Sequence, residues 1–224
     1  MKNLSKLLIV VVLLAIGNQC YAQIFRVKAG LNLSNMLYKD NDATLSDHFK
    51  MIPGFHIGAT AEFPINKMFS FEPGLLLSTK GYKAEESETY QGVTSEYKAN
   101  LTLYYIDIPL NAKATFDVGG VKIYGAFGPY LGIGLSGKGK TETNYMGQTE
   151  SDNHDVKWGS DAENDDLKRF DFGLTFGAGA EIKSFLFGIS YGLGLVNISS
   201  YTDGGTKACN RVLGISVGYK FGGK

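Results

Sequence analysis

Cysteine is scarce in this sequence of 224 residues, which has only Cys20 and Cys209. Cys20 lies in an N-terminal segment that we expect to be removed, so the mature chain would keep one cysteine. A single cysteine cannot form an internal disulfide, and this excludes a fold held together by disulfides. We therefore expect Cys209 to be an unpaired thiol near the end of a loop.

The sequence also lacks an excess of charge of either sign. It has 22 basic and 22 acidic residues, a formal net charge of zero and an isoelectric point near 6.8. A nucleic-acid-binding domain usually has a basic face. No nucleic-acid partner is therefore expected.

Long hydrophobic runs are missing apart from one, at residues 7–16. A transmembrane helix needs about twenty apolar residues, so this run is too short to span a bilayer. Two lysines precede it, and the small residues Cys20 and Ala22 follow it at the positions preferred before a cleavage site. We predict a signal peptide over residues 1–22 and a mature domain over 23–224. Lipidation of Cys20 is the alternative, but Gln19 stands where a lipoprotein site needs a small residue.

Glycine, by contrast, is abundant: 29 of 224 residues, roughly twice the average usage of about 7%. The stretch "RFDFGLTFGAGAEI" (169–182) shows how the glycines are used. Apolar residues occupy every second position, and glycines, charged residues and a threonine fill the others. A period of two predicts a β-strand with two different faces.

Eight segments share this alternation, and turn-rich stretches separate them. They are residues 24–33, 54–63, 69–80, 101–115, 121–136, 169–182, 185–198 and 211–221. Short and long polar connections alternate strictly along the chain. This pattern predicts one all-β domain: an eight-stranded antiparallel up-and-down β-barrel with all long loops at one mouth and both termini at the other.

The composition of the two strand faces indicates whether water or lipid surrounds the barrel. A soluble barrel would turn its apolar face inward and show many charged residues to water. Here the non-apolar face is rich in glycine, which suits the narrow lumen of an eight-stranded barrel. The apolar face is nearly free of charge, as contact with lipid requires, because a lipid-facing Lys or Arg at mid-depth costs about 2–4 kcal/mol. We therefore predict a transmembrane barrel in a bacterial outer membrane.

Charged residues recur on the predicted inward faces, mostly near the short-turn mouth. That mouth would hold Arg26, Glu62, Glu72, Lys113, Lys122, Glu181 and Lys220; Asp107 would lie deeper, and Asp171 is also inward. Buried charges need partners, so we interpret the set as mutually neutralising ion pairs that fill the lumen. A proton or ion path is the alternative.

The acidic stretch over residues 152–166 contains the sole tryptophan, Trp158. We interpret the stretch as a solvated extracellular loop that extends by charge repulsion, with Trp158 as a candidate contact for a partner. A cation site is the alternative, although the spacing lacks the EF-hand pattern.

No catalytic, cofactor-binding or metal-ligating residue is predicted. Of the three histidines only His56 lies on an expected strand, where it would pack in the lumen. Ser78 and Ser190 face inward, but no sequence pattern pairs either of them with His56 as a general base. We therefore expect no enzyme activity and no cofactor.

Several segments, including "YYIDIPLNAKA", "GAFGPYLGIGLSG" and "DFGLTFGAGAEI", resemble the outer-membrane β-barrel domain family of small porin-like proteins. The resemblance spans nearly all of the mature chain, and it implies an integral outer-membrane barrel inserted by the barrel assembly machinery. Such barrels often end on an aromatic residue; here three residues follow Phe221.

These observations predict a barrel with a side-chain-filled lumen and a structural, adhesive or partner-docking role through its long extracellular loops. Its partners would be outer-membrane lipid and an extracellular or envelope component that the sequence does not identify. A narrow pore or transporter for small solutes is the alternative, and a lumen-ligand-binding or enzymatic barrel is a third possibility.

Overall fold

The computed structural model describes residues 24–44, 46, 49–90, 93–145 and 148–221. The predicted signal peptide, with Cys20, lies outside the described residues. His48 and the three residues after Phe221 lie outside them as well.

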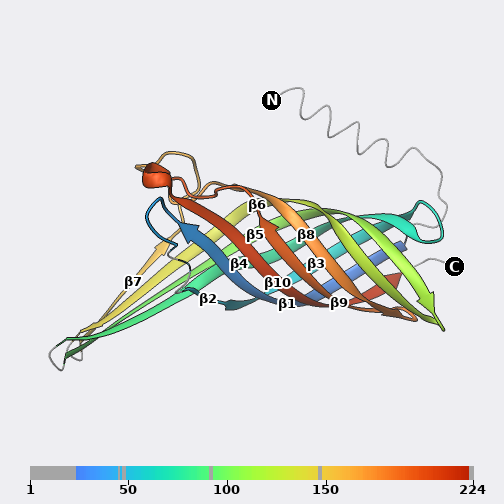
Figure 1. The fold of residues 1–224 in the computed structure, drawn as a ribbon, viewed down its shortest axis with the longest axis horizontal. Coiled ribbons are helices and arrows are strands. Elements are labelled where there is room, and N and C mark those ends of the chain that lie inside the picture. The colour runs from blue at the N-terminus through green and yellow to red at the C-terminus, as the bar shows by residue number, and fades with distance from the viewer. Residues whose placement is uncertain (1–23, 45, 47–48, 91–92, 146–147, 222–224) are drawn as a thin grey trace.

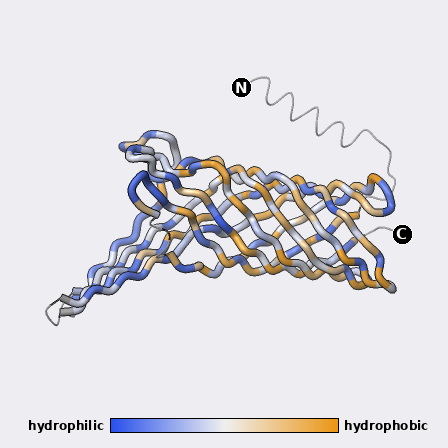
Figure 2. The backbone as a smooth tube through the Cα atoms, in the orientation of Figure 1, coloured by the Kyte–Doolittle hydropathy of each residue, from blue (hydrophilic) through white to orange (hydrophobic). Residues whose placement is uncertain are grey.

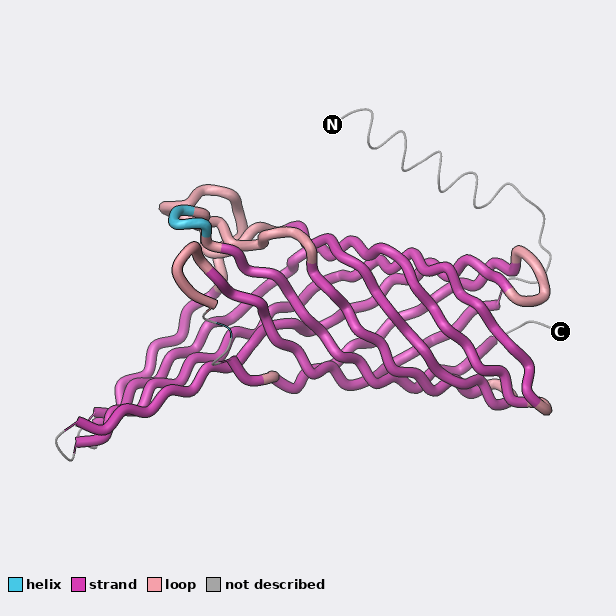
Figure 3. The backbone as a smooth tube through the Cα atoms, viewed as in Figure 1, coloured by secondary structure: helices cyan, strands magenta, loops and turns pink. Residues whose placement is uncertain are grey.

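The described chain consists almost entirely of strands (Figures 1 and 3). They are β1 (Ile24–Lys39), β2 (Phe49–Lys50), β3 (Ile52–Pro64), β4 (Phe69–Tyr90), β5 (Val93–Val118), β6 (Val121–Tyr145), β7 (Gln148–Asp155), β8 (Phe170–Ile182), β9 (Phe185–Gly194) and β10 (Lys207–Phe221). A 3-10 turn, η2 (Asp203–Gly205), precedes β10. Among the described residues, no helix has the length and hydropathy needed to cross a bilayer.

Eight of the strands form a closed antiparallel ring in the order β1, β3, β4, β5, β6, β8, β9 and β10. The first and last strands close the ring, with their register running from Phe25 opposite Phe221 to Lys39 opposite Lys207. Short turns join β3 to β4, β5 to β6 and β8 to β9 at one mouth. The start of β1 and the end of β10 lie at this same mouth (Figure 1). The predicted eight-stranded up-and-down barrel is confirmed.

The barrel turns its apolar side chains outward and its polar ones inward. Ile189 of β9 is 59% exposed, whereas Arg26 of β1 and Lys113 of β5 are 3% and 1% exposed. Figure 2 shows the hydrophobic residues concentrated along the barrel and the hydrophilic ones toward the loop-side mouth. Exposed aromatic rings line the turn-side rim, where Tyr219 contacts both Phe185 and Phe221 at centroid distances of 5.4 and 4.9 Å. This is the orientation that lipid contact requires.

The prediction of polar loops is wrong for two segments, which are strands in the structure. Residues 81–90 of β4 pair with residues 93–102 of β5 as a long hairpin, and residues 137–145 of β6 and 148–155 of β7 extend its sheet. In the outer part of β5, aromatic or small side chains such as Tyr97 and Ala99 alternate with polar ones such as Lys98, whereas β7 is polar on both faces. The four strands form a sheet that projects from the loop-side mouth (Figure 1), which we call the arm.

Other boundaries also differ from the prediction. β1 continues to Lys39, and β9 ends at Gly194, four residues before the predicted end. His154 lies on β7, so His56 is not the only histidine on a strand. Cys209, the one cysteine among the described residues, is buried and forms no disulfide within them, and it lies near the start of β10.

Replacing Ile189 with arginine tests the lipid-facing orientation. We expect Ile189→Arg to lower the free energy of unfolding by about 2–4 kcal/mol, because it places a cation against hydrocarbon near mid-depth. The measurement is a urea titration in lipid vesicles, in which the folded fraction at each urea concentration is read from the gel shift between the folded and the boiled barrel. Thr143→Arg, on the exposed surface of the arm, is the matched control and should leave the midpoint unchanged. Equal midpoints for the two variants would contradict the orientation.

Candidate functional site: the charged lumen and the arm

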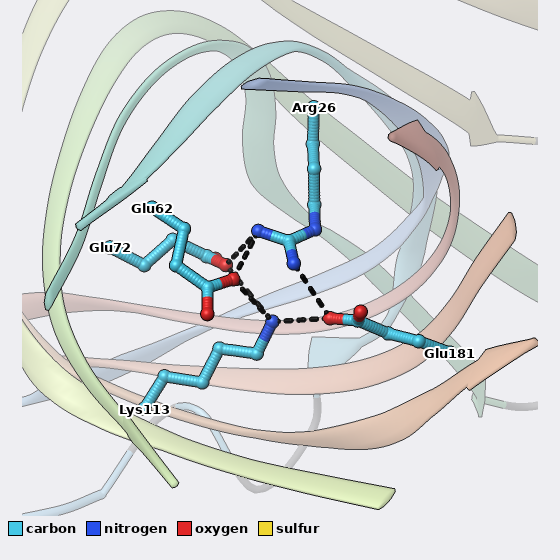
Figure 4. A network of polar contacts seen from close by, with 5 residues as sticks. All are labelled: Arg26, Glu62, Glu72, Lys113 and Glu181. Carbon is cyan, nitrogen blue, oxygen red and sulfur yellow. Dashed lines mark hydrogen bonds and ion pairs between the residues drawn. The ribbon is translucent and has the colours of Figure 1, made fainter. Parts of the chain in front are cut away.

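Five charged side chains meet inside the turn-side half of the barrel (Figure 4). The Arg26 guanidinium contacts the carboxylates of Glu62, Glu72 and Glu181, at 3.3 Å for Glu72 and 2.8 Å for Glu181. The Lys113 Nζ lies 2.5 Å from Glu181, 3.1 Å from Glu62 and 3.4 Å from Glu72. Each of the two cations therefore bridges the same three carboxylates.

The five residues of this network come from five different strands: β1, β3, β4, β5 and β8. The period of two turns each of them inward at nearly the same depth, and all five are buried. An isolated buried charge would cost several kcal/mol, so the network is stable only when it is nearly complete. It ties together strands on all sides of the lumen.

Lys122 and Lys220 do not join this network, contrary to the sequence prediction. Lys122 is exposed and Lys220 is half-buried, and within the described residues neither makes an ion pair. Both line a cavity of about 130 Å³ at the turn-side mouth. Water can solvate them there, and Glu181 already pairs with Arg26 and Lys113, so a further ion pair would gain little.

A second charged layer lies deeper in the lumen. The Lys80 Nζ lies 2.8 Å from Asp107 and 3.0 Å from Asp171. The Tyr130 hydroxyl and the Asn210 amide donate hydrogen bonds of 3.0 and 2.9 Å to the same Asp171 oxygen. The structure thus separates Asp107 and Asp171 from the other predicted charges and pairs them with Lys80. Sequence reasoning missed Lys80, although it ends the third predicted strand in phase with the inward positions.

A hydrophobic cluster covers the lumen above this second layer. It consists of Met36, Leu103, Tyr105, Val156, Leu167, Ile198 and Ala208, with Trp158 packed against it. The Trp158 ring meets Tyr105 edge-on at a centroid distance of 5.6 Å. A side chain at Gly134 would collide with the indole, at 2.5 Å from its nearest atom, so glycine is needed there.

Trp158 is therefore partly buried against this cluster, and its role as a partner contact stays a prediction. An indole buries a large apolar area, and the cluster provides it with a surface to cover. The stretch over residues 152–166 is not an extended loop. Its first part belongs to β7, and Asp161 closes a compact turn by accepting backbone hydrogen bonds from Glu163 and Asp165.

The arm has a charged face that supports its own structure. The Lys50 Nζ of β2 lies 2.6 Å from Glu85 of β4, and Lys83 pairs with the same carboxylate. Hydrogen bonds from these two ammonium groups lower the pKa of Glu85 to about 2. Glu85 thus stays ionised across the physiological range and holds β2 against the base of the arm.

His56 packs in the lumen, as predicted. Its Nε2 lies 2.9 Å from the Ser216 hydroxyl, and its Nδ1 lies 2.7 Å from the Asn32 side-chain oxygen. The inward serines that the sequence suggested, Ser78 and Ser190, are not its partners. Sequence reasoning missed Ser216 because β10 and β3 are far apart in the chain, and only closure of the ring through β1 brings them near.

Removing Lys113 tests the first charged layer. We expect Lys113→Met to lower the free energy of unfolding by about 3–5 kcal/mol, because three buried carboxylates would then share a single cation. A urea titration in vesicles measures this change. Lys122→Met is the matched control, since Lys122 lies at the same end of the barrel outside the network, and it should shift stability by less than about 1 kcal/mol. A similar loss in both variants would show that the network does not stabilise the fold.

The similarity of this chain to individual known proteins is low. No curated protein matches the chain significantly. Ail, the attachment invasion locus protein of Yersinia pestis, solved in complex with the heparin analogue sucrose octasulfate, is 17% identical, with 90% of this chain and 100% of that chain covered and a TM-score of 0.38. Neisserial surface protein A is 15% identical, with coverages of 88% and 97% and a TM-score of 0.43. These likenesses are too distant to assign a function.

The match to a family is much more extensive. A family described as "Outer membrane protein beta-barrel domain" matches residues 22–200. This range runs from the start of β1 through β9, and it includes every charged residue of both layers. Asn210 of β10, which donates a hydrogen bond to Asp171, lies outside the range. The chain therefore belongs to the outer membrane β-barrel domain family and is an integral protein of the bacterial outer membrane.

Proposed function

We propose that this protein is a sealed outer-membrane barrel whose arm docks an extended segment of a partner protein. The observation that carries this proposal is the free edge of β7. Within the described residues β7 pairs with β6 alone, and every one of its residues is exposed. An unpaired edge presents a row of backbone donors and acceptors to another strand.

The direction of the backbone groups on β7 supports this role. The Val156 N–H, just after β7, donates to the Gly137 carbonyl on β6 at 2.9 Å. Backbone groups alternate sides along an antiparallel strand, so those of Ser151 and Asn153 point away from β6. The arm carries this edge away from the barrel over about ten residue pairs, roughly 30 Å at the rise of a β-strand.

The lumen supports the sealed character of the barrel. Two layers of ion pairs and the hydrophobic cluster with Trp158 follow one another along the axis. An eight-stranded ring leaves an interior just wide enough for side chains. The alternative of a narrow pore rests on small cavities between the layers, about 50 and 80 Å³ in volume.

Conductance separates the sealed barrel from the pore. We expect the purified protein to show no channel events in a planar bilayer at ordinary voltages, because each charged layer blocks the axis. A porin reconstituted in parallel would show that the assay detects channels. Reproducible single-channel steps that disappear after denaturation would establish the pore instead.

Blocking the backbone donors of β7 tests docking. Protein in lipid nanodiscs is used to select binders from a library of displayed peptides. We expect the double variant Ser151→Pro, Asn153→Pro to lose binding of the selected peptides by at least about tenfold, because proline has no N–H to donate. The matched control, Ser151→Ala with Asn153→Ala, keeps both N–H groups and should retain binding. Equal binding by the two double variants, or failure to select any peptide, would contradict strand addition at β7.

A further inference from the structure

Three polar residues are joined by hydrogen bonds across neighbouring strands in the centre of the lumen. Ser216 of β10 and His56 of β3 both stand opposite Gly30 of β1, one on either side. A side chain at Gly30 would meet the His56 ring at 2.5 Å, so the glycine lets the imidazole cross β1 and reach Ser216. The resulting series of hydrogen bonds runs from Ser216 Oγ to His56 Nε2 (2.9 Å) and from His56 Nδ1 to Asn32 Oδ1 (2.7 Å).

The surroundings of Asn32 determine which nitrogen of His56 carries the proton. The Asn32 amide nitrogen donates to the backbone carbonyls of Phe55 and Thr79 at 3.1 and 3.0 Å. These two acceptors fix the orientation of the amide, because only its NH₂ group can donate to them. The Asn32 oxygen then faces His56 and must accept a proton from Nδ1–H.

The neutral imidazole that results has its lone pair on Nε2, toward Ser216. The serine hydroxyl therefore donates to Nε2, and this is the arrangement in which a histidine can remove the serine proton. Asn32 holds the base from its other side. Ser216, His56 and Asn32 therefore correspond to a nucleophile, a base and a positioning residue.

The same residues open onto a cavity of about 80 Å³ between the two charged layers. Ser216, His56 and Lys28 line it, together with apolar groups such as Leu76 and Pro109. Within the described residues Lys28 makes no ion pair, whereas Arg26, Lys80 and Lys113 all contact carboxylates. Lys28 is thus a basic side chain of the cavity that no carboxylate engages in the described part of the chain.

We propose that Ser216 is a nucleophile activated by His56, positioned by Asn32, in a lumen site for small esters with short acyl groups. The Ser216 oxygen bonds to the acyl carbon while its proton passes to His56 Nε2. The carbon–oxygen bond of the ester then breaks, and the same proton passes to the leaving alkoxide. Water then bonds to the acyl carbon while one of its protons passes to His56 Nε2. The bond from that carbon to Ser216 Oγ breaks, the serine oxygen takes the proton back, and the acid is released. This inference goes beyond docking by the arm, runs against the expectation of a barrel without enzyme activity, and requires that a small ester and water pass the layers that close the lumen to ions.

Methanesulfonyl fluoride is a probe small enough for this cavity. Its sulfur would bond to the Ser216 oxygen, fluoride would leave, and the serine proton would pass through His56 to solvent. We expect one methanesulfonyl group on the folded protein, located at Ser216 by peptide mass spectrometry, and none on protein unfolded before treatment. Failure of the folded wild type to react, or labelling spread over several serines, would overturn the proposal.

Variants in the lumen identify the roles of the three residues. Ser216→Ala should abolish labelling, and His56→Gln should slow it on the order of 100-fold, the usual contribution of a general base. Ser87→Ala removes an exposed serine of the arm, far from the cavity, and it should react like the wild type. The gel shift on boiling verifies that each variant folds. Labelling of Ser216→Ala at the wild-type rate would exclude Ser216 as the nucleophile.

Asn32 has both a supporting and a positioning role, and two substitutions separate them. Asn32→Asp loses the two amide donors but keeps an oxygen acceptor for His56 Nδ1–H, whereas Asn32→Ala loses both. We expect Asn32→Asp to be labelled within about threefold of the wild-type rate, and Asn32→Ala to be at least about tenfold slower, since the base then lacks its orienting partner. Equal rates for the two variants would show that Asn32 only supports the structure.

Discussion

The absence of water in the bilayer core is the constraint on which the rest of this structure depends. Each backbone N–H and C=O within the hydrocarbon needs a partner from the protein, and only a closed ring of strands supplies one for every residue. Here β1 meets β10 to close a ring of eight. A ring of this size has a narrow lumen, and glycines on its inward faces leave room for the large side chains that do point inward.

The lumen must then neutralise the charges that the strands carry into it. Arg26 and Lys113 share the same three carboxylates, and Lys80 joins Asp107 to Asp171 on a separate level. Side chains from strands on opposite walls meet in these layers, so a strand that slipped by one residue would turn its charge toward lipid. The layers therefore specify the register of the barrel as well as its stability.

Outside the membrane the same strands serve a different purpose. β4, β5 and β6 continue past the barrel into the arm, where water solvates both faces and charged pairs such as Lys50 with Glu85 hold neighbouring strands together. The barrel anchors this sheet, and the arm presents the edge of β7. Between them, the cluster around Trp158 lies at the loop-side end of the lumen. Contact with lipid and contact with water are thus divided along the length of single strands.

The sequence by itself determined the ring of eight strands, its orientation in lipid and most of the inward charges, because a period of two assigns each residue of a strand to one face. It did not predict the arm, where polar residues on both faces look like a loop. Only the tertiary structure decided which charges meet, left Lys122 and Lys220 without an ion pair to any described residue, and brought Ser216 to His56. Those contacts join residues as far apart as 160 positions, and they depend on ring closure and depth, which no local pattern encodes.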